Sequence, residues 1–122
     1  MPIFFYVWLP SLQLSDKGLQ GGTTMVINVK NETGGFEVIG SRGAGEIIRK
    51  KMKKELDKGN TVTLDFVGVE QVTQSFIDEF FGIFIRAFGM EYIRGKVLLV
   101  NETQGIKDTI NFVIKYSKEM VA

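Results

Sequence analysis

A short stretch in the middle of the chain contains most of the side chains that could carry chemistry. Ser75, Asp78 and Glu79 open an apolar segment, and Gly82 and Arg86 continue the same polar pattern. Residues spaced three and four apart lie on one face of a helix, so these positions would form a single polar stripe. The stripe offers a hydroxyl, two carboxylates and a guanidinium to whatever binds there.

The residue types that are missing limit this chemistry. The chain contains no histidine and no cysteine. It therefore has no imidazole base, no Ser-His pair, no disulfide and no ordinary zinc site. Hydrolase and transferase reactions of the usual kinds are largely excluded, so we predict no catalytic residue, no metal and no cofactor. The lack of cysteine suits a reducing compartment and favours a cytoplasmic location.

Ser75 has a structural and a functional interpretation. It precedes an apolar run and has Asp78 three positions later, which is the spacing of a helix capping box. A cap of this kind contributes about 1 kcal/mol. Alternatively, Ser75 is a phosphorylatable hydroxyl at a helix N-terminus. The two nearby carboxylates would repel the added dianion, which favours the capping role.

Arg42 is the second residue with two interpretations. It lies in the first turn of a predicted helix, where a cation is disfavoured by roughly 0.3–1 kcal/mol and needs compensation. An ion pair with Asp65, Asp78 or Glu79 would supply it. The alternative function is a small-ligand domain or enzyme in which Arg42, Asp65, Asp78 and Glu79 surround an anion or Mg²⁺.

The elements that must position these residues follow from the hydrophobic pattern. Met25–Val29 and Phe36–Ile39 alternate as strands do, and the glycines between them predict a hairpin. The remaining pattern predicts a helix from Gly40 to about Asp57, a buried strand at 61–66, a helix at 75–88, a strand at 96–100 and a helix from Thr103 to about Met120. This order predicts an α/β fold in two layers, with a mixed β-sheet and helices mainly on one face.

Composition favours one small globular domain without a polyanionic partner. The chain has 122 residues, 44% hydrophobic and 24% charged, and a net charge of +1. The basic residues between Arg49 and Lys58 are diluted by Glu55 and Asp57 and lack interleaved aromatic rings, so we predict a solvated face and no nucleic-acid partner. The apolar run Ile3–Leu9 is too short to span a membrane.

The first 24 residues form a separate part in this interpretation. We predict that they are an N-terminal extension, an edge strand or strap followed by a linker, and that residues 25–122 form the domain. An exposed apolar strand seeks a sheet edge, so the extension could also pair with another chain. The chain would then be a monomer or a weak homodimer through its N-terminal strand.

The motifs of the central region resemble those of a known family. Leu64-Asp65-Phe66, Gly68-Val69 and Ser75-Phe76-Ile77-Asp78-Glu79, preceded by Gly40-Ser41-Arg42, resemble the STAS-like family of uncharacterised bacterial domains. The hallmark of that family is Ser-Phe-Ala-Asp-Glu. The similarity covers roughly Met25 to Met120. More distant relatives are the STAS domains of anti-sigma-factor antagonists, which bind ATPase-type serine kinases and switch partners on phosphorylation.

The resemblance implies a non-catalytic regulatory module that binds a protein, for example a GHKL-type ATPase. Aligned from Leu64, the serine phosphorylated in anti-sigma-factor antagonists falls on Gln74, their aspartate on Thr73 and their glycine on Phe76. This departure leaves Ser75 or Thr73 as the possible phosphate acceptor. We expect the partner to bind at a surface from Val72 to Glu79 with Arg42 beside it. Its contact residues would be Thr73, Gln74, Ser75, Phe76, Asp78, Glu79 and Arg42.

Overall fold

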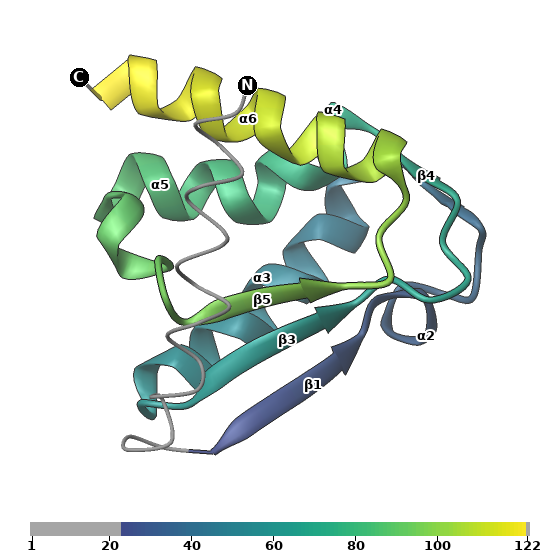
Figure 1. The fold of residues 1–122 in the computed structure, drawn as a ribbon, viewed down its shortest axis with the longest axis horizontal. Helices are drawn as coiled ribbons and strands as arrows, with labels where there is room; N and C mark the ends of the chain where they lie inside the picture. Colours follow the sequence, from purple (N-terminus) through teal and green to yellow (C-terminus); the bar gives the residue numbers. More distant parts are fainter. Residues whose placement is uncertain (1–22, 122) are drawn as a thin grey trace.

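The computed structural model describes residues 23–121 (Figure 1). Its main sheet has the strand order β1-β3-β5, with all described pairings parallel. A second pair, β2 and β4, is also parallel. The strands are β1 (Thr24–Asn28), β2 (Val38–Ile39), β3 (Thr61–Asp65), β4 (Gln71–Val72) and β5 (Val97–Val100).

Three long helical segments accompany the sheet. They are α3 (Arg42–Asp57), a central helix of three consecutive parts and α6 (Gln104–Val121). The central helix consists of α4 (Gln74–Ile77), the π-helical turn η2 (Asp78–Gly82) and α5 (Ile83–Phe88). Two short pieces complete the described part, α2 (Val29–Glu32) and the 3-10 turn η3 (Met90–Tyr92).

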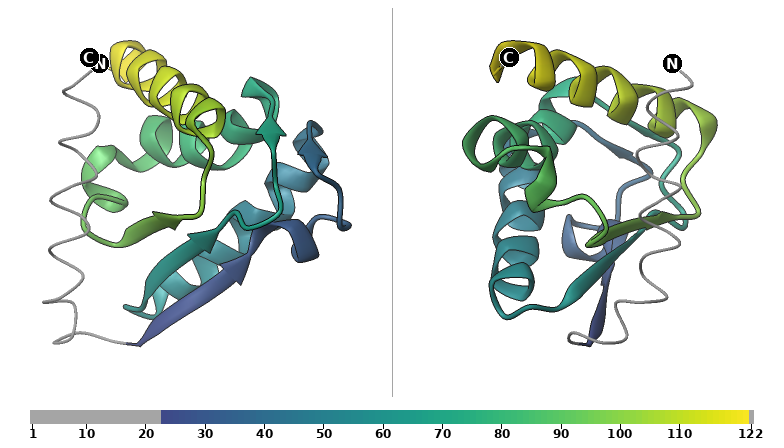
Figure 2. Two further views of the ribbon diagram at one scale, coloured as in Figure 1. Left: turned by 45° about the vertical axis from the view of Figure 1, so that its right-hand side comes forward. Right: turned by 60° about the vertical axis from the view of Figure 1, so that its left-hand side comes forward.

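The sheet is covered on one face. Val62 and Leu64 of β3 are fully buried, whereas Val26 of β1, on the opposite face, is 65% exposed. Successive side chains of a strand point to opposite faces, so this contrast separates a core face from an open face. Figure 2 shows α3 and α5 on the core side of the sheet, with α6 lying across the top of the domain.

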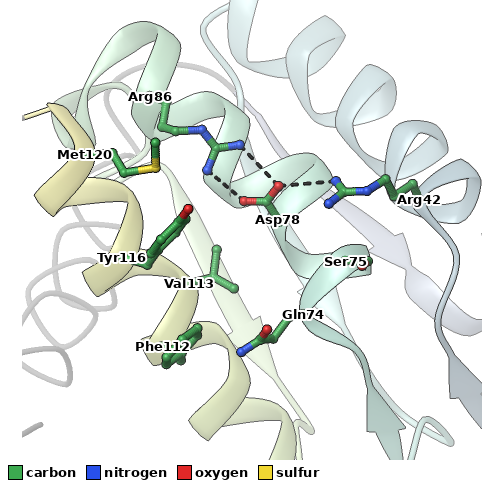
Figure 3. Close-up of a pocket in the computed structure, with 9 residues that line it drawn as sticks. All are labelled: Arg42, Gln74, Ser75, Asp78, Arg86, Phe112, Val113, Tyr116 and Met120. Carbon is green, nitrogen blue, oxygen red and sulfur yellow. Dashed lines mark hydrogen bonds and ion pairs between the residues drawn. The ribbon is translucent and has the colours of Figure 1, made fainter.

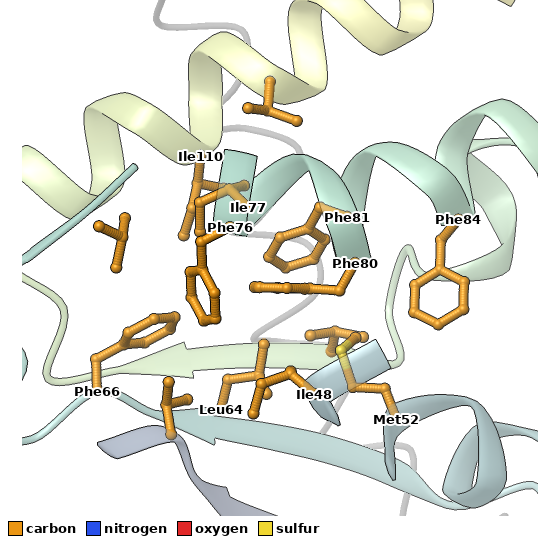
Figure 4. Close-up of a cluster of buried hydrophobic side chains, with 14 of the residues drawn as sticks. Ile48, Met52, Leu64, Phe66, Phe76, Ile77, Phe80, Phe81, Phe84 and Ile110 are labelled. Atoms are coloured by element: carbon orange, nitrogen blue, oxygen red, sulfur yellow. The ribbon is translucent and has the colours of Figure 1, made fainter. Parts of the chain in front are cut away.

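Phenylalanine rings of the central helix fill the space between the sheet and the helices. Phe76, Phe80, Phe81 and Phe84 are almost completely buried, and Phe76 meets Phe80 edge to face at 5.1 Å. Ile48 and Met52 of α3 reach the same cluster from the other side (Figure 4). The central helix is therefore packed against core along most of its length, and its two ends, at Gln74 and at Phe88, are exposed.

The predicted fold class is confirmed, and one part of the predicted topology is wrong. The domain is α/β with helices gathered on one face, and α3, β3, β5 and α6 lie where the pattern places them. The predicted hairpin does not form. β1 pairs with β3, and β2 pairs with β4, so the described strands are parallel and not mixed. Between β1 and β2 the chain turns through α2, and Gly34 and Gly35 with φ of 108° and 85° follow that helix.

The predicted N-terminal extension lies almost wholly outside the described residues. β1 begins at Thr24, one residue before the predicted domain start. The boundary at residue 24, the edge strand or strap and the dimer through that strand remain predictions.

Candidate functional site

The start of the central helix is fixed by Thr73 and not by Ser75. The Thr73 hydroxyl accepts a hydrogen bond from the Phe76 amide at 3.2 Å and donates one to the Gly40 carbonyl at 2.8 Å. Its backbone is extended, with φ −97° and ψ 163°, because β4 ends at Val72. The prediction that Ser75 is the cap was wrong, since Ser75 already lies inside the first turn.

This arrangement predicts different effects for two neighbouring hydroxyls. Thr73→Ala is expected to lower the free energy of unfolding by about 1 kcal/mol, the usual loss for an N-cap. Ser75→Ala should change it by less than about 0.5 kcal/mol, as other surface substitutions do. Urea denaturation of both variants measures the difference. A larger loss for Ser75→Ala would contradict the observed cap.

Behind the cap, the helix passes through the π-helical turn Asp78–Gly82. Such turns are rare and often occur at functional sites. Gly82 lies between Asp78 and Arg86, and a side chain there would collide with both, because a Cβ atom would lie 2.8 Å from Arg86 Nη1. The turn and the glycine together allow Asp78 to reach Arg86 along the helix.

Asp78 is the centre of a network of charged side chains. It accepts two hydrogen bonds from Arg86, at 2.7 and 3.2 Å, and one from Arg42 at 3.3 Å. These bonds lower the pKa of the Asp78 carboxyl, with Arg86 as the larger cause. Arg86 is three-quarters buried and also donates to the buried Ser117 hydroxyl at 3.1 Å. The network therefore joins α3, η2, α5 and α6.

Glu79 extends the network towards α3. It pairs with Arg42 at 3.2 Å and with Arg49, which also donates to the Glu79 backbone carbonyl at 3.1 Å. The ion pair predicted for Arg42 is thus present, with Asp78 and Glu79 as its partners. Arg49 was assigned to the solvated basic face and is instead mostly covered, with 21% of its side chain exposed. Arg49 follows Ile48 and comes three residues before Met52, so it lies at the edge of the buried stripe of α3. This spacing could have predicted that Arg49 is partly covered.

A cleft of about 540 Å³ opens beside this network (Figure 3). One wall is the central helix with Gln74, Ser75, Asp78 and Arg86, and Arg42 lies at the rim. The other wall is α6, which contributes Phe112, Val113, Tyr116 and Met120. Sequence reasoning missed this wall. Phe112, Tyr116 and Met120 recur every four residues, a pattern that continues the apolar face of α6 beyond the part the core covers.

The structure brings together most but not all of the predicted site residues. Thr73, Gln74, Ser75, Asp78, Glu79 and Arg42 lie along the start of the central helix and the facing end of α3. Phe76 does not belong to an accessible surface, because it is completely buried in the core. Its inclusion among the partner contacts was wrong. Phe76 is the position that turns inward between Ser75 and the acidic pair, and it supports the surface from beneath.

Asp65 lies apart from the other predicted acids. Its carboxylate accepts hydrogen bonds from the Val67 amide at 3.0 Å and the Asn101 side chain at 2.9 Å. Within residues 23–121, no three or more acidic, histidine or cysteine side chains are grouped to hold a metal ion. Asp78 and Glu79 already have arginine partners, so their charges are compensated without Mg²⁺.

Because arginines already pair with Asp78 and Glu79, we predict that neither Mg²⁺ nor nucleotides stabilise the protein. At millimolar Mg²⁺ or nucleotide, we expect no change in melting temperature. A site with a Kd one hundred times below the ligand concentration would add about 2.7 kcal/mol to stability. Differential scanning fluorimetry measures this, with NaCl at equal ionic strength as the control. A clear rise with Mg²⁺ would support the alternative function that uses Arg42, Asp65, Asp78 and Glu79.

Fold and site together define a small α/β domain with a charged, cross-linked helix start beside an open cleft. The sequence model of one family, the STAS-like domain of unknown function (DUF4325), matches residues 44–107, just over half of the chain. The chain belongs to this STAS-like family. The matched region contains α3 from its third residue onward, β3, β5 and the entire central helix. No curated protein and no solved structure matches the chain significantly. In the part of the chain that the structure describes, no helix combines the length and apolar character needed to cross a bilayer.

Proposed function

We propose that this domain is a non-catalytic regulatory module that binds another protein at the start of its central helix. The binding surface consists of Thr73, Gln74, Ser75, Asp78 and Glu79, with Arg42 beside them. The observation that carries the proposal is that this surface is accessible to a partner and is also held in one conformation. Thr73 and Gln74 are exposed and Ser75 is half-buried, on a helix start that three arginines hold in position.

Preorganisation is what a recognition surface gains from this arrangement. A partner that contacts side chains already held in one conformation loses less entropy than one that must order them. Asp78 and Glu79 are each bonded to two arginines, so the surface keeps its shape before a partner arrives. Catalysis has no comparable support, because no side chain of the set has a general base or nucleophile pair beside it.

The partner we favour is a GHKL-type ATPase or serine kinase that acts in partner switching, as the resemblance to anti-sigma-factor antagonists implies. Ser75 fits the role of phosphate acceptor better than Thr73. The Thr73 hydroxyl donates to Gly40 and accepts from Phe76, and phosphorylation would break the donated bond. Ser75 lines the cleft together with Arg42, and the repelling carboxylates near it are compensated by arginines.

A binding experiment with matched variants tests the proposal. The full chain serves as bait, captured proteins are identified by mass spectrometry, and the affinity of the candidate partner is then measured by calorimetry. Ser75→Glu places a charge on the proposed surface and is expected to weaken binding at least tenfold, about 1.4 kcal/mol. The melting temperature should hardly move, because the Ser75 side chain is half-buried and does not cap the helix.

Lys54→Glu is the matched control. Lys54 lies on the exposed outer side of α3 and does not line the cleft. We expect it to bind the partner as the parent chain does. Equal weakening by both variants would indicate a general charge effect, and unchanged affinity for Ser75→Glu would contradict the proposed surface. Treatment with the candidate kinase, followed by mass measurement of parent and Ser75→Ala chains, tests the phosphate acceptor.

A further inference from the structure

The α6 wall of the cleft is an apolar surface that the described residues leave uncovered. Phe112, Tyr116 and Met120 are 52%, 48% and 58% exposed. The two rings lie parallel, with centroids 6.4 Å apart, and extend the wall along the helix. Figure 3 shows these side chains along α6, facing Gln74, Asp78 and Arg86 of the central helix. Contiguous exposed apolar side chains beside polar ones mark interaction sites.

The size of this wall indicates what kind of chain segment covers it. A large side chain buries about 150–250 Å² in full, so three half-exposed ones offer roughly 300 Å². A stable interface between two domains needs about 800 Å² from each partner. The wall is too small to hold a second copy of the domain by itself. Its dimensions suit a short apolar segment lying between α6 and the central helix.

This chain has such a segment in Ile3–Leu9, which lies outside the described residues. It is a run of seven apolar residues, Ile-Phe-Phe-Tyr-Val-Trp-Leu, without one charged side chain. A segment that rests on a surface by one face alternates polar and apolar residues, whereas a continuous apolar run is covered on both sides. A cleft with two walls provides this cover.

A second recess among the described residues fits the segment poorly. It lies along β1 and the outer side of α3 and has a volume of about 170 Å³, one-third of the cleft. Four of its seven lining residues are charged, namely Glu32, Lys51, Lys54 and Glu55. An uncharged aromatic segment would desolvate these groups without offering them partners, which is unfavourable.

The connection between segment and domain is long enough to reach the cleft. Residues 10–23 separate Leu9 from the start of β1. Fourteen residues extend to at most about 50 Å, and a flexible chain of that length has a typical end-to-end distance of about 20 Å. A domain of this size has a radius of gyration of about 13 Å. Tethering raises the effective concentration to about millimolar, so weak contacts suffice for binding.

We propose that Ile3–Leu9 of the same chain binds in the cleft between α6 and the central helix, against Phe112, Tyr116 and Met120. The cleft shares Gln74, Ser75 and Asp78 with the proposed partner surface. The inference does not depend on that partner, because its test measures Trp8 in the isolated chain. It has one consequence for that partner. A protein that extends from the helix start into the cleft must displace the segment.

The only tryptophan of the chain, Trp8, reports on this contact. In the full-length protein, its emission is expected to be blue-shifted, and its quenching by acrylamide reduced, relative to a synthetic peptide of residues 1–22. The double substitution Phe112→Ser and Tyr116→Ser should return both signals to those of the peptide. Phe36→Ser is the matched control, since Phe36 is 65% exposed and does not line the cleft.

A second measurement places the contact without altering the wall. The chain has no cysteine, so a single Glu119→Cys, exposed and three residues after Tyr116, can carry a bimane label. Trp8 quenches bimane on contact, and Trp8→Phe should restore its emission. A label at Lys54→Cys, beside the recess along β1, should not be quenched. Thermal unfolding confirms that each variant is folded, and the labelled Glu119→Cys protein decides the question if the double variant is not.

Every outcome decides the proposal. Blue-shifted Trp8 emission that the wall substitutions abolish, with quenching at Glu119→Cys, supports it. Trp8 as accessible as in the peptide overturns it. If Trp8 is shielded but the wall substitutions do not change its emission or quenching, the proposal is overturned in favour of the β1 edge. The same holds if only the label at Lys54→Cys is quenched. Quenching that disappears on dilution shows contact between two chains and also overturns it.

Discussion

Replacing Gly45 with valine is expected to cost about 3 kcal/mol of stability, the upper end of the usual loss from overpacking. Gly45 is buried where α3 crosses the central helix. A Cβ atom there would lie 2.6 Å from the Phe76 carbonyl oxygen and 2.6 Å from Glu79 Cβ. The obstacle includes backbone, so the helices must separate, and Phe76 would leave its place in the core.

Gly43→Val is the matched control, because Gly43 lies in the same helix and is exposed. The nearest atom to a Cβ atom at that position is Ser41 Oγ at 3.9 Å. Valine and glycine differ by only about 0.4 kcal/mol in helix propensity, so Gly43→Val should be nearly neutral. Urea denaturation of both variants gives the comparison. Equal losses at the two positions would contradict the close packing of α3 on the central helix.

The second large effect is expected for Asp78→Ala, which should lower the free energy of unfolding by about 2 kcal/mol near neutral pH. Removing the carboxylate leaves Arg42 and Arg86 without their shared partner. Arg42 still pairs with Glu79 and is 59% exposed, so the loss of its bond to Asp78 lowers the free energy of unfolding only a little. Arg86 is only 26% exposed, and hydrogen bonds to charged groups contribute about 1.5–3 kcal/mol. Asp108→Ala, at an exposed position of α6, is the control and should be nearly neutral.

The effect of Asp78→Ala should depend on pH in one direction. The folded state lowers the pKa of Asp78 below its ordinary value of 3.8, so the folded protein binds fewer protons there than the unfolded chain. The stabilisation is therefore complete above about pH 4 and is lost as the pH falls through the lowered pKa. Urea titrations of parent and variant between pH 7 and pH 2 should converge in the acid range. A difference that stays constant down to pH 2 would contradict the ion pair as its source.

Local patterns predicted the elements that are long and strongly periodic. The apolar spacing of Ile48, Met52 and Leu56 located α3, and the β-rich run at 61–65 located the central strand. These signals depend on neighbouring residues in the chain, which is why they survive without knowledge of the fold. The motif around Ser75-Phe76-Ile77-Asp78-Glu79 likewise indicated the STAS-like family, to which the chain belongs.

Errors arose where the outcome depended on distant residues. Nothing near Met25 or Val38 shows that their strands pair with 61–65 and 71–72, in parallel, and not with each other. The N-cap of the central helix moved from Ser75 to Thr73 because Gly40, more than thirty residues away, accepts the threonine hydroxyl. Phe76 was included among the partner contacts because it lies within the segment from Val72 to Glu79, and only the tertiary packing showed that it faces inward.

The sequence by itself determined where the long helices and the central strand form, which family the chain belongs to, and which polar residues accompany the central helix. Tertiary structure decided what those polar residues do. It assigned Arg42, Arg49 and Arg86 to Asp78 and Glu79, and it set α6 beside them to form a cleft. The physical reason is the distance along the chain over which each kind of interaction acts. Periodicity and capping preferences act over a few residues. Arg42 and Arg49 instead reach Asp78 and Glu79 across thirty or more residues, and the cleft forms only where α6 packs beside the central helix.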